Sequence, residues 1–189
     1  MVTIATHPSP VAEPKIAVLM AEYNRWMNER MYGAAATLDV ETLVANKGAF
    51  FGSILGTLNH IAVVDTIWRH RFAQHEASFS SLSNLSKFPQ PSSLSQSLAP
   101  GLEGLRGYRR ELDALIERWV ADLTPAHLSA YIAYSNMAGV RSNRNFGALL
   151  QHFFNHQTHH RGRVSTLLFQ SGVDVGITDL LAVIPGSDA

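Results

Sequence analysis

The sequence predicts an all-α protein built as a four-helix bundle. Four segments of roughly 20–25 residues repeat hydrophobic side chains at three- and four-residue spacing, which is the period of an amphipathic helix. The 189 residues suit one domain that buries a sizeable core. No solenoid-type repeat interrupts this pattern. A bundle builds its sites between facing helices, so polar side chains on the inner faces are the candidates for function.

The first helix is expected at residues 16–37, after a flexible arm at 1–15 that contains three prolines. Its inward face is formed by Val18, Leu19, Tyr23, Trp26, Met27 and Met31. A connector follows at 38–52, with a short helical turn near 41–45.

The second helix is expected at 53–75. Its apolar sector consists of Ile54, Leu58, Ile61, Val64, Trp68 and Phe72. Residues 80–101 are rich in serine and proline and poor in charge, which predicts a long, partly mobile surface connection.

The third and fourth helices are expected at 102–122 and 146–170, and Gly172 ends the fourth. The third helix turns Leu105, Tyr108, Leu112, Leu115, Ile116 and Trp119 inward. Between them, 123–145 favours a short hairpin that turns around residues 137–139. The domain therefore spans 16–175, and 176–189 is a C-terminal tail.

Composition narrows the function. The formal net charge is zero and the pI is about 7.1, so no basic excess favours a nucleic-acid partner. The N-terminal residues lack the pattern of a signal peptide, and the apolar run at 16–20 is too short to span a membrane. We expect a cytoplasmic protein without a membrane partner. The chain contains no cysteine, which excludes disulfides, thiolate metal sites and a cysteine nucleophile.

Histidine is the informative residue type, and four of the nine histidines lie in HFFNHQTHHRGR at 152–163. A helix turns about 100° per residue. With His156 at zero, His160 lies at about 40°, and the positions of Leu149, Leu167, Phe153, Phe146 and Val164 at about 20–80° predict an apolar stripe centred on that pair. His152 falls at the edge of the stripe and His159 further outward.

Two histidines at i and i+4 can bind one metal ion together, but they need a third ligand from another helix. The other histidines are His7, His60, His70, His75 and His127. Only His60 is embedded in apolar sequence (LNHIAVV), so it is the candidate. The alternative is that His60 is an ordinary buried core residue, and that the pair is structural. His75 and His159 are expected to be solvated or to support a ligand. The spacings of ferritin-like di-iron sites and of HExxH zinc sites are absent.

Three segments carry a family resemblance. YNRWMNERM at 23–31, LNHI at 58–61 and NHQTHHRGRV at 155–164 resemble the DinB/YfiT-like superfamily of metalloenzymes. The similarity covers about 16–172, and the insert at 80–100 departs from compact members.

The resemblance implies an up-and-down four-helix bundle of the DinB/YfiT-like type, often a homodimer. It also implies one divalent metal ion, zinc or nickel, bound by three histidines. Carried over position by position, the ligands are His60, His156 and His160, with His152 and His159 as alternative or supporting residues.

Three imidazoles leave a coordination position open, which is typical of catalytic sites. The resemblance implies a metal-dependent enzyme that acts on a small molecule, of the thiol-dependent S-transferase or isomerase type. Because the chain lacks cysteine, a low-molecular-weight thiol would be a cosubstrate. A hydrolase and a non-catalytic, stress-associated metal-binding protein are the alternatives.

A few arginines and residues of the first helix are candidates for substrate binding. Arg144, Arg161 and Arg163 are suited to a substrate carboxylate; the alternative is that they are solvated or packing residues. Trp26, with Tyr23 and Asn28, is a candidate lining residue, against plain core packing.

Overall fold

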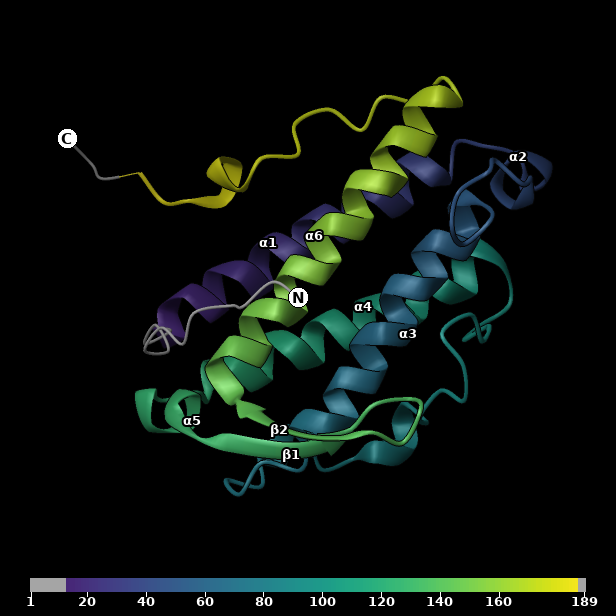
Figure 1. The fold of residues 1–189 in the computed structure, drawn as a ribbon. Coiled ribbons are helices and arrows are strands. Elements are labelled where there is room, and N and C mark those ends of the chain that lie inside the picture. The colour runs from purple at the N-terminus through teal and green to yellow at the C-terminus, as the bar shows by residue number, and fades with distance from the viewer. Residues whose placement is uncertain (1–12, 187–189) are drawn as a thin grey trace, which may run out of the picture.

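A computed structural model describes residues 13–186, and these residues are mostly helical, as the sequence predicts (Figure 1). The long helices are α1 (Pro14–Ala35), α3 (Ile54–Phe72), α4 (Gly101–Ala121) and α6 (Phe146–Gln170). The short elements are α2 (Val40–Val44), α5 (Pro125–Ser129), the 3₁₀ turns η1 (Ser80–Leu82), η2 (Leu85–Lys87) and η3 (Leu180–Val183), and the strands β1 (Tyr131–Ser135) and β2 (Arg141–Asn145). The predicted arm at 1–15 lies almost wholly outside the described residues.

Local chemistry fixes where the two histidine-bearing helices begin. The side chain of Ser53 accepts a hydrogen bond from the backbone N–H of Gly56 and caps α3. The side chain of Asn145 does the same for Ala148 and caps α6. Such caps satisfy N–H groups that have no partner within the helix. The caps fix the first residue of each helix and thereby the positions of His60 and His156 along it.

The four long helices pack in the cyclic order α1, α4, α3, α6. Helices α3 and α4 run parallel. This follows from two contacts: Asp65 contacts Arg109 and, further along both helices, Phe72 contacts Trp119. This differs from the alternating up-and-down order that the resemblance implies. The reason is the connection at 73–100, which returns along α3 before α4 begins (Figure 1).

The connection at 73–100 is held against α3 by hydrogen bonds. Asn59 donates to the carbonyl of Gln96 and accepts from the N–H of Leu98. Near the other end of α3, Arg69 donates to the carbonyl of Asn84 at 2.5 Å. The serine-rich insert therefore forms part of the wall beside His60.

The hairpin predicted between the third and fourth helices is present, with β1 and β2 antiparallel and Tyr131 opposite Asn145. Tyr134 of β1 reaches α3, where its ring lies 5.4 Å from that of Trp68. At the other end of the chain, Tyr23 of α1 donates to the carbonyl of Thr178. The hairpin and the C-terminal segment thus both pack on the long helices.

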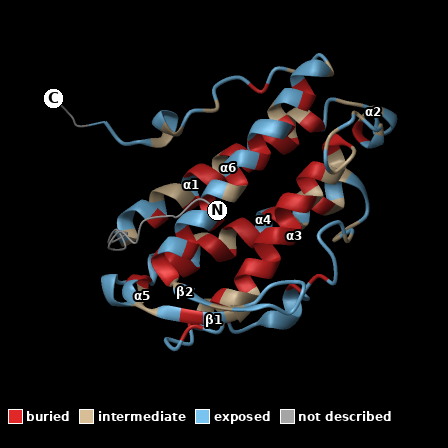
Figure 2. Cartoon of the chain, in the orientation of Figure 1, coloured by how far each residue is buried: buried red, intermediate tan, exposed pale blue. Residues whose placement is uncertain are grey.

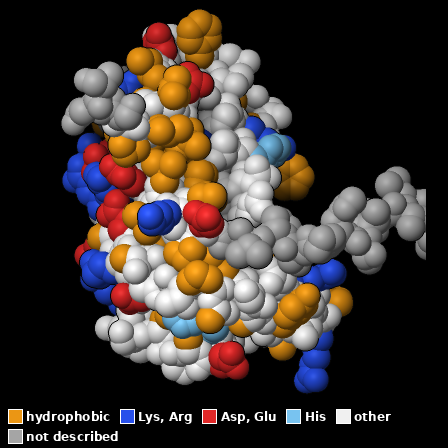
Figure 3. Space-filling model, turned by 90° about the vertical axis from the view of Figure 1, so that its left-hand side faces the viewer, with side chains coloured by type: hydrophobic (Ala, Val, Ile, Leu, Met, Phe, Trp, Pro, Cys, Tyr) orange, Lys and Arg blue, Asp and Glu red, His pale blue; other side chains and the backbone are white. Residues whose placement is uncertain are grey.

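Buried residues line the faces that the four helices turn toward one another (Figure 2). Basic and acidic side chains are interspersed on the face shown in Figure 3. Within residues 13–186, none of the helices combines the length and apolar character needed to cross a membrane.

Candidate metal centre

Three histidines converge between α3 and α6. His60 comes from the first half of α3, and His156 and His160 come from successive turns of α6. One ring nitrogen of each lies within 4.8 Å of the others. The ring centroids are 4.4–5.4 Å apart. The trio selected from the sequence is therefore brought together by the fold.

The orientation of His60 is fixed by two neighbours outside the helices. Its Nδ1 lies 3.0 Å from the carbonyl oxygen of Leu94 in the insert. A carbonyl only accepts, so Nδ1 carries the proton and Nε2 keeps its lone pair free for a metal. The ring of Phe51 stacks on the face of the imidazole, with centroids 3.5 Å apart and an interplanar angle of 17°.

The free nitrogens fit a metal ion. Zinc–nitrogen bonds of about 2.0–2.1 Å place tetrahedral ligands about 3.4 Å apart, and the ring nitrogens of the trio lie within 4.8 Å of one another. Nδ1 of His156 and Nδ1 of His160 are buried and have no hydrogen-bond partner within residues 13–186. A buried ring nitrogen without a partner is unfavourable. A metal ion bound among the three rings offsets that cost.

The histidines are neutral at physiological pH, as ligands must be. Burial, together with the neighbouring imidazoles, lowers the pKa of His156 to about 3 and that of His160 to about 4. Burial also lowers the pKa of His60. Protons therefore do not compete with a metal ion for these nitrogens near pH 7.

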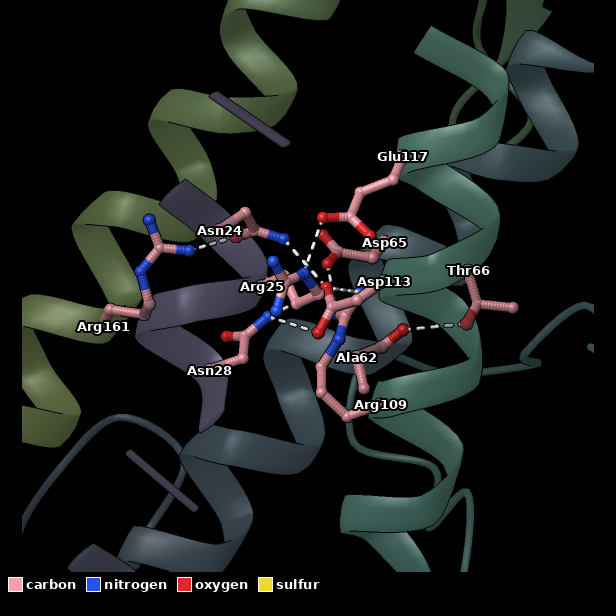
Figure 4. Close-up of polar contacts among 10 residues, drawn as sticks. All are labelled: Asn24, Arg25, Asn28, Ala62, Asp65, Thr66, Arg109, Asp113, Glu117 and Arg161. Atoms are coloured by element: carbon pink, nitrogen blue, oxygen red, sulfur yellow. Dashed lines mark hydrogen bonds and ion pairs between the residues drawn. The ribbon is translucent and has the colours of Figure 1, made fainter. Parts of the chain in front are cut away.

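A buried charge network lies beside the trio. It comprises Asn24 and Asn28 of α1, Asp65 of α3, Arg109 and Asp113 of α4, and Arg161 of α6 (Figure 4). Arg109 contacts Asp65 at 2.5 Å and Asp113 at 2.8 Å. Asn24 links Asp113 to Arg161, the residue that follows His160. Because this bond ties α6 to α1, it fixes the rotation of α6 and thereby the direction of its ligands.

The family comparison agrees with this geometry. The model of the DinB family matches residues 11–186, which is nearly the whole chain. The chain belongs to the DinB family. No curated protein and no solved structure matches the sequence. The matched residues of this DinB protein include the serine-rich insert and the C-terminal segment up to residue 186.

The phase predicted for α6 needs correction. Its buried face is centred near Gln157, which is 0% exposed, whereas His156 is half-buried at the edge of that face. The prediction counted only some of the hydrophobic residues and left out Leu150, Phe154 and Leu168, which are buried on the side of Gln157. Arg161 on the same side is 2% exposed. Arg161 is thus not solvated, and it donates to Asn24 and Thr158.

The remaining histidines stand apart from the trio. His152 is exposed, and its ring lies 6.3 Å from that of His156 and 5.4 Å from that of Trp68. His159 is exposed beside His160. His75, expected to be solvated or to support a ligand, is 3% exposed; its ring accepts from the N–H of Ala77 and lies beside the carbonyl of His127.

The predicted substrate residues lie in different places in this DinB protein. Arg163 is exposed on α6, and its charge contributes to the lowered pKa of His60 and His160, so it lies near the trio. Arg144 lies on β2 opposite Ile132. Trp26 lies on α1, beside Tyr23 and under Arg30. The substrate roles of Arg144 and Trp26 stay predictions.

Phe51 and Leu94 were not predicted as parts of the site. Both lie in connecting segments, and neither hydrophobic periodicity nor motif spacing signals a contact with a residue on another element. The glycine at position 56 is the one sequence feature that is related to this contact, because a Cβ there would clash with the backbone oxygen of Phe51. Glycine at that position lets the connector approach α3 closely enough for Phe51 to cover His60.

Proposed function

We propose that this protein binds one divalent metal ion, zinc or nickel, through His60, His156 and His160. The observation that carries the proposal is the convergence of three neutral imidazoles from two helices. Within residues 13–186, the group contains no fourth histidine or carboxylate. Three protein ligands leave a coordination position for an exogenous molecule, as in catalytic rather than structural zinc sites.

We infer that the protein is an enzyme that transfers or isomerises a small molecule with the help of a thiol cosubstrate. A divalent ion in the trio would lower the pKa of a bound water or thiol. The thiol comes from a second molecule, since the chain has no cysteine. The family resemblance supports this reaction class over hydrolysis. By the same resemblance, we propose a cytoplasmic homodimer, which sedimentation analysis would test.

The residues around the trio have separable roles in this proposal. The carbonyl of Leu94 accepts a hydrogen bond from Nδ1–H of His60 and so keeps Nε2 available to the ion. Phe51 covers the ring of His60 and excludes water from that side. Arg163 adds positive charge near His60 and His160, which favours an anionic substrate or thiolate.

Turnover tests the proposed reaction. The protein is loaded with zinc or with nickel and mixed with a panel of low-molecular-weight thiols and electrophiles, and thiol consumption is followed. We expect the metal-loaded protein to accelerate consumption, His60→Ala to lose the acceleration, and His159→Ala to retain it. Equal rates for the wild type and His60→Ala across the panel would overturn the enzymatic assignment in favour of non-catalytic metal binding.

A further inference from the structure

A row of aromatic side chains leads from the histidine trio along the contact between α3 and α6. The ring of His152 lies 6.3 Å from that of His156, and the ring of Trp68 lies 5.4 Å from that of His152. Tyr134 of β1 continues the row, with its ring 5.4 Å from that of Trp68. These contacts connect the trio with the hairpin.

An arginine lies at the far end of this row. The guanidinium of Arg71 lies 4.6 Å from the ring centroid of Trp68 and 5.1 Å from that of Tyr134. Contact with two aromatic rings restrains the guanidinium through cation–π attraction. Arg71 is half-buried, and it forms no ion pair or side-chain hydrogen bond within residues 13–186.

Helix geometry directs Arg71 toward the trio. Arg71 follows His60 by eleven residues, which places the two side chains within about 20° of one another on α3 and about 16 Å apart along its axis. Side chains on a helix lean toward its N-terminus, so the guanidinium extends back over Trp68 in the direction of His60. Arg71 and His60 therefore lie along the same side of α3.

We propose that Arg71 binds a carboxylate at one end of a small molecule whose other end binds at the histidine trio. A guanidinium presents paired, coplanar donors that recognise a carboxylate. The substrate or thiol cosubstrate is thus an elongated acid that extends from the trio past His152 to Arg71. This inference rests on the proposed function, because it takes the trio as the position of the other end.

The contact also has a purely structural alternative. Arg71 would then serve only to fasten the hairpin to α3 through Trp68 and Tyr134, and its replacement would lower stability without changing ligand choice. The two readings differ in one measurable quantity, which is the preference of the loaded protein for a carboxylate over a neutral group of the same size.

The test uses protein loaded with cobalt(II), whose charge-transfer absorption reports a bound thiolate. Dissociation constants are measured for mercaptopropionic, mercaptohexanoic and mercaptoundecanoic acids, each with its thiol at the end opposite the carboxylate, and for the matching mercapto-alcohols. We expect the wild type to prefer the acid about tenfold at one of the longer chain lengths. Arg71→Gln loses this preference, and Arg71→Lys retains part of it. Arg118→Gln, at an exposed arginine of α4, leaves it unchanged.

Two outcomes overturn the inference in distinguishable ways. If thiols bind the metal but the wild type shows no acid preference at any chain length, Arg71 is not a carboxylate site, while the proposed function stands. The same conclusion follows if Arg71→Gln keeps the preference. If no thiol produces the charge-transfer band in the cobalt protein, the proposed thiol chemistry fails, and this inference fails with it.

Discussion

Removing Arg109 tests the account of the buried charge network. Arg109 is 2% exposed and contacts two carboxylates, Asp65 at 2.5 Å and Asp113 at 2.8 Å. Arg109→Leu keeps the bulk of the side chain but leaves both carboxylates buried beside a single remaining cation, Arg161. Breaking a buried ion pair in this way costs about 3–5 kcal/mol. We expect the free energy of unfolding to fall by that amount.

The pH dependence of this loss has a defined sign. Burial raises the pKa of Asp65 to about 6 in the wild type, with Arg109 opposing the rise. Without Arg109 the pKa rises further above its unfolded value of about 3.9. The folded variant then binds more protons than the unfolded chain, so lowering the pH stabilises it. The penalty of Arg109→Leu is therefore smaller at about pH 5 than at about pH 8.

Urea unfolding followed by circular dichroism measures both effects. Arg110→Leu, at an exposed neighbour on α4, is the control and is expected to change stability by less than about 0.5 kcal/mol. Adding Asp65→Asn to Arg109→Leu is expected to restore part of the loss, because one uncompensated charge is removed. A loss below about 1 kcal/mol, or one that is equal at both pH values, would refute the description of this network as charged and tightly paired.

Two further predictions concern the trio. Gly56→Ala is expected to weaken zinc affinity about tenfold, because the new Cβ pushes the backbone of Phe51 away and moves the Phe51 ring off His60. Calorimetric titration measures the affinity, with Gly33→Ala as the control because its Cβ meets no neighbour. Equal affinities for Gly56→Ala and the wild type would contradict the role of Phe51. In metal-free protein, the free energy of unfolding is expected to fall as the pH drops below about 6.5, since the unfolded chain takes up protons that folded His156, with a pKa of about 3, does not. Urea unfolding at several pH values measures this slope, and His156→Ala should flatten it; an unchanged slope would show that His156 is not the cause.

The sequence predicts those parts of the fold that depend on local patterns. The 3.6-residue period locates all four long helices within a few residues, and α6 spans the predicted 146–170. Helix direction is harder, because α3 and α4 run parallel only after the connection at 73–100 has returned along α3. That path depends on contacts such as those between Asn59 and the backbone of Gln96 and Leu98, which no periodicity records.

The candidate site shows the same difference between local patterns, which the sequence records, and contacts between distant segments, which it does not. Spacing on one helix, together with the apolar setting of His60, is sufficient to select the trio. The residues that orient the trio lie in connecting segments, namely Phe51 and the carbonyl of Leu94. Arg161 shows another limit, since a charged residue is predicted to be solvated unless its partner on another helix is known. Asn24, 137 positions earlier in the chain, is that partner.

Metal content tests the central claim most directly. The protein is produced without a histidine tag, equilibrated with zinc or nickel, freed of unbound ions and analysed by mass spectrometry for metal per chain. The account predicts one ion per chain in the wild type, in His152→Ala and in His159→Ala, and almost none in His60→Ala, His156→Ala or His160→Ala, with all variants folded by circular dichroism. A wild type without stoichiometric metal, or an ion retained by the trio variants and lost from His152→Ala, would contradict it.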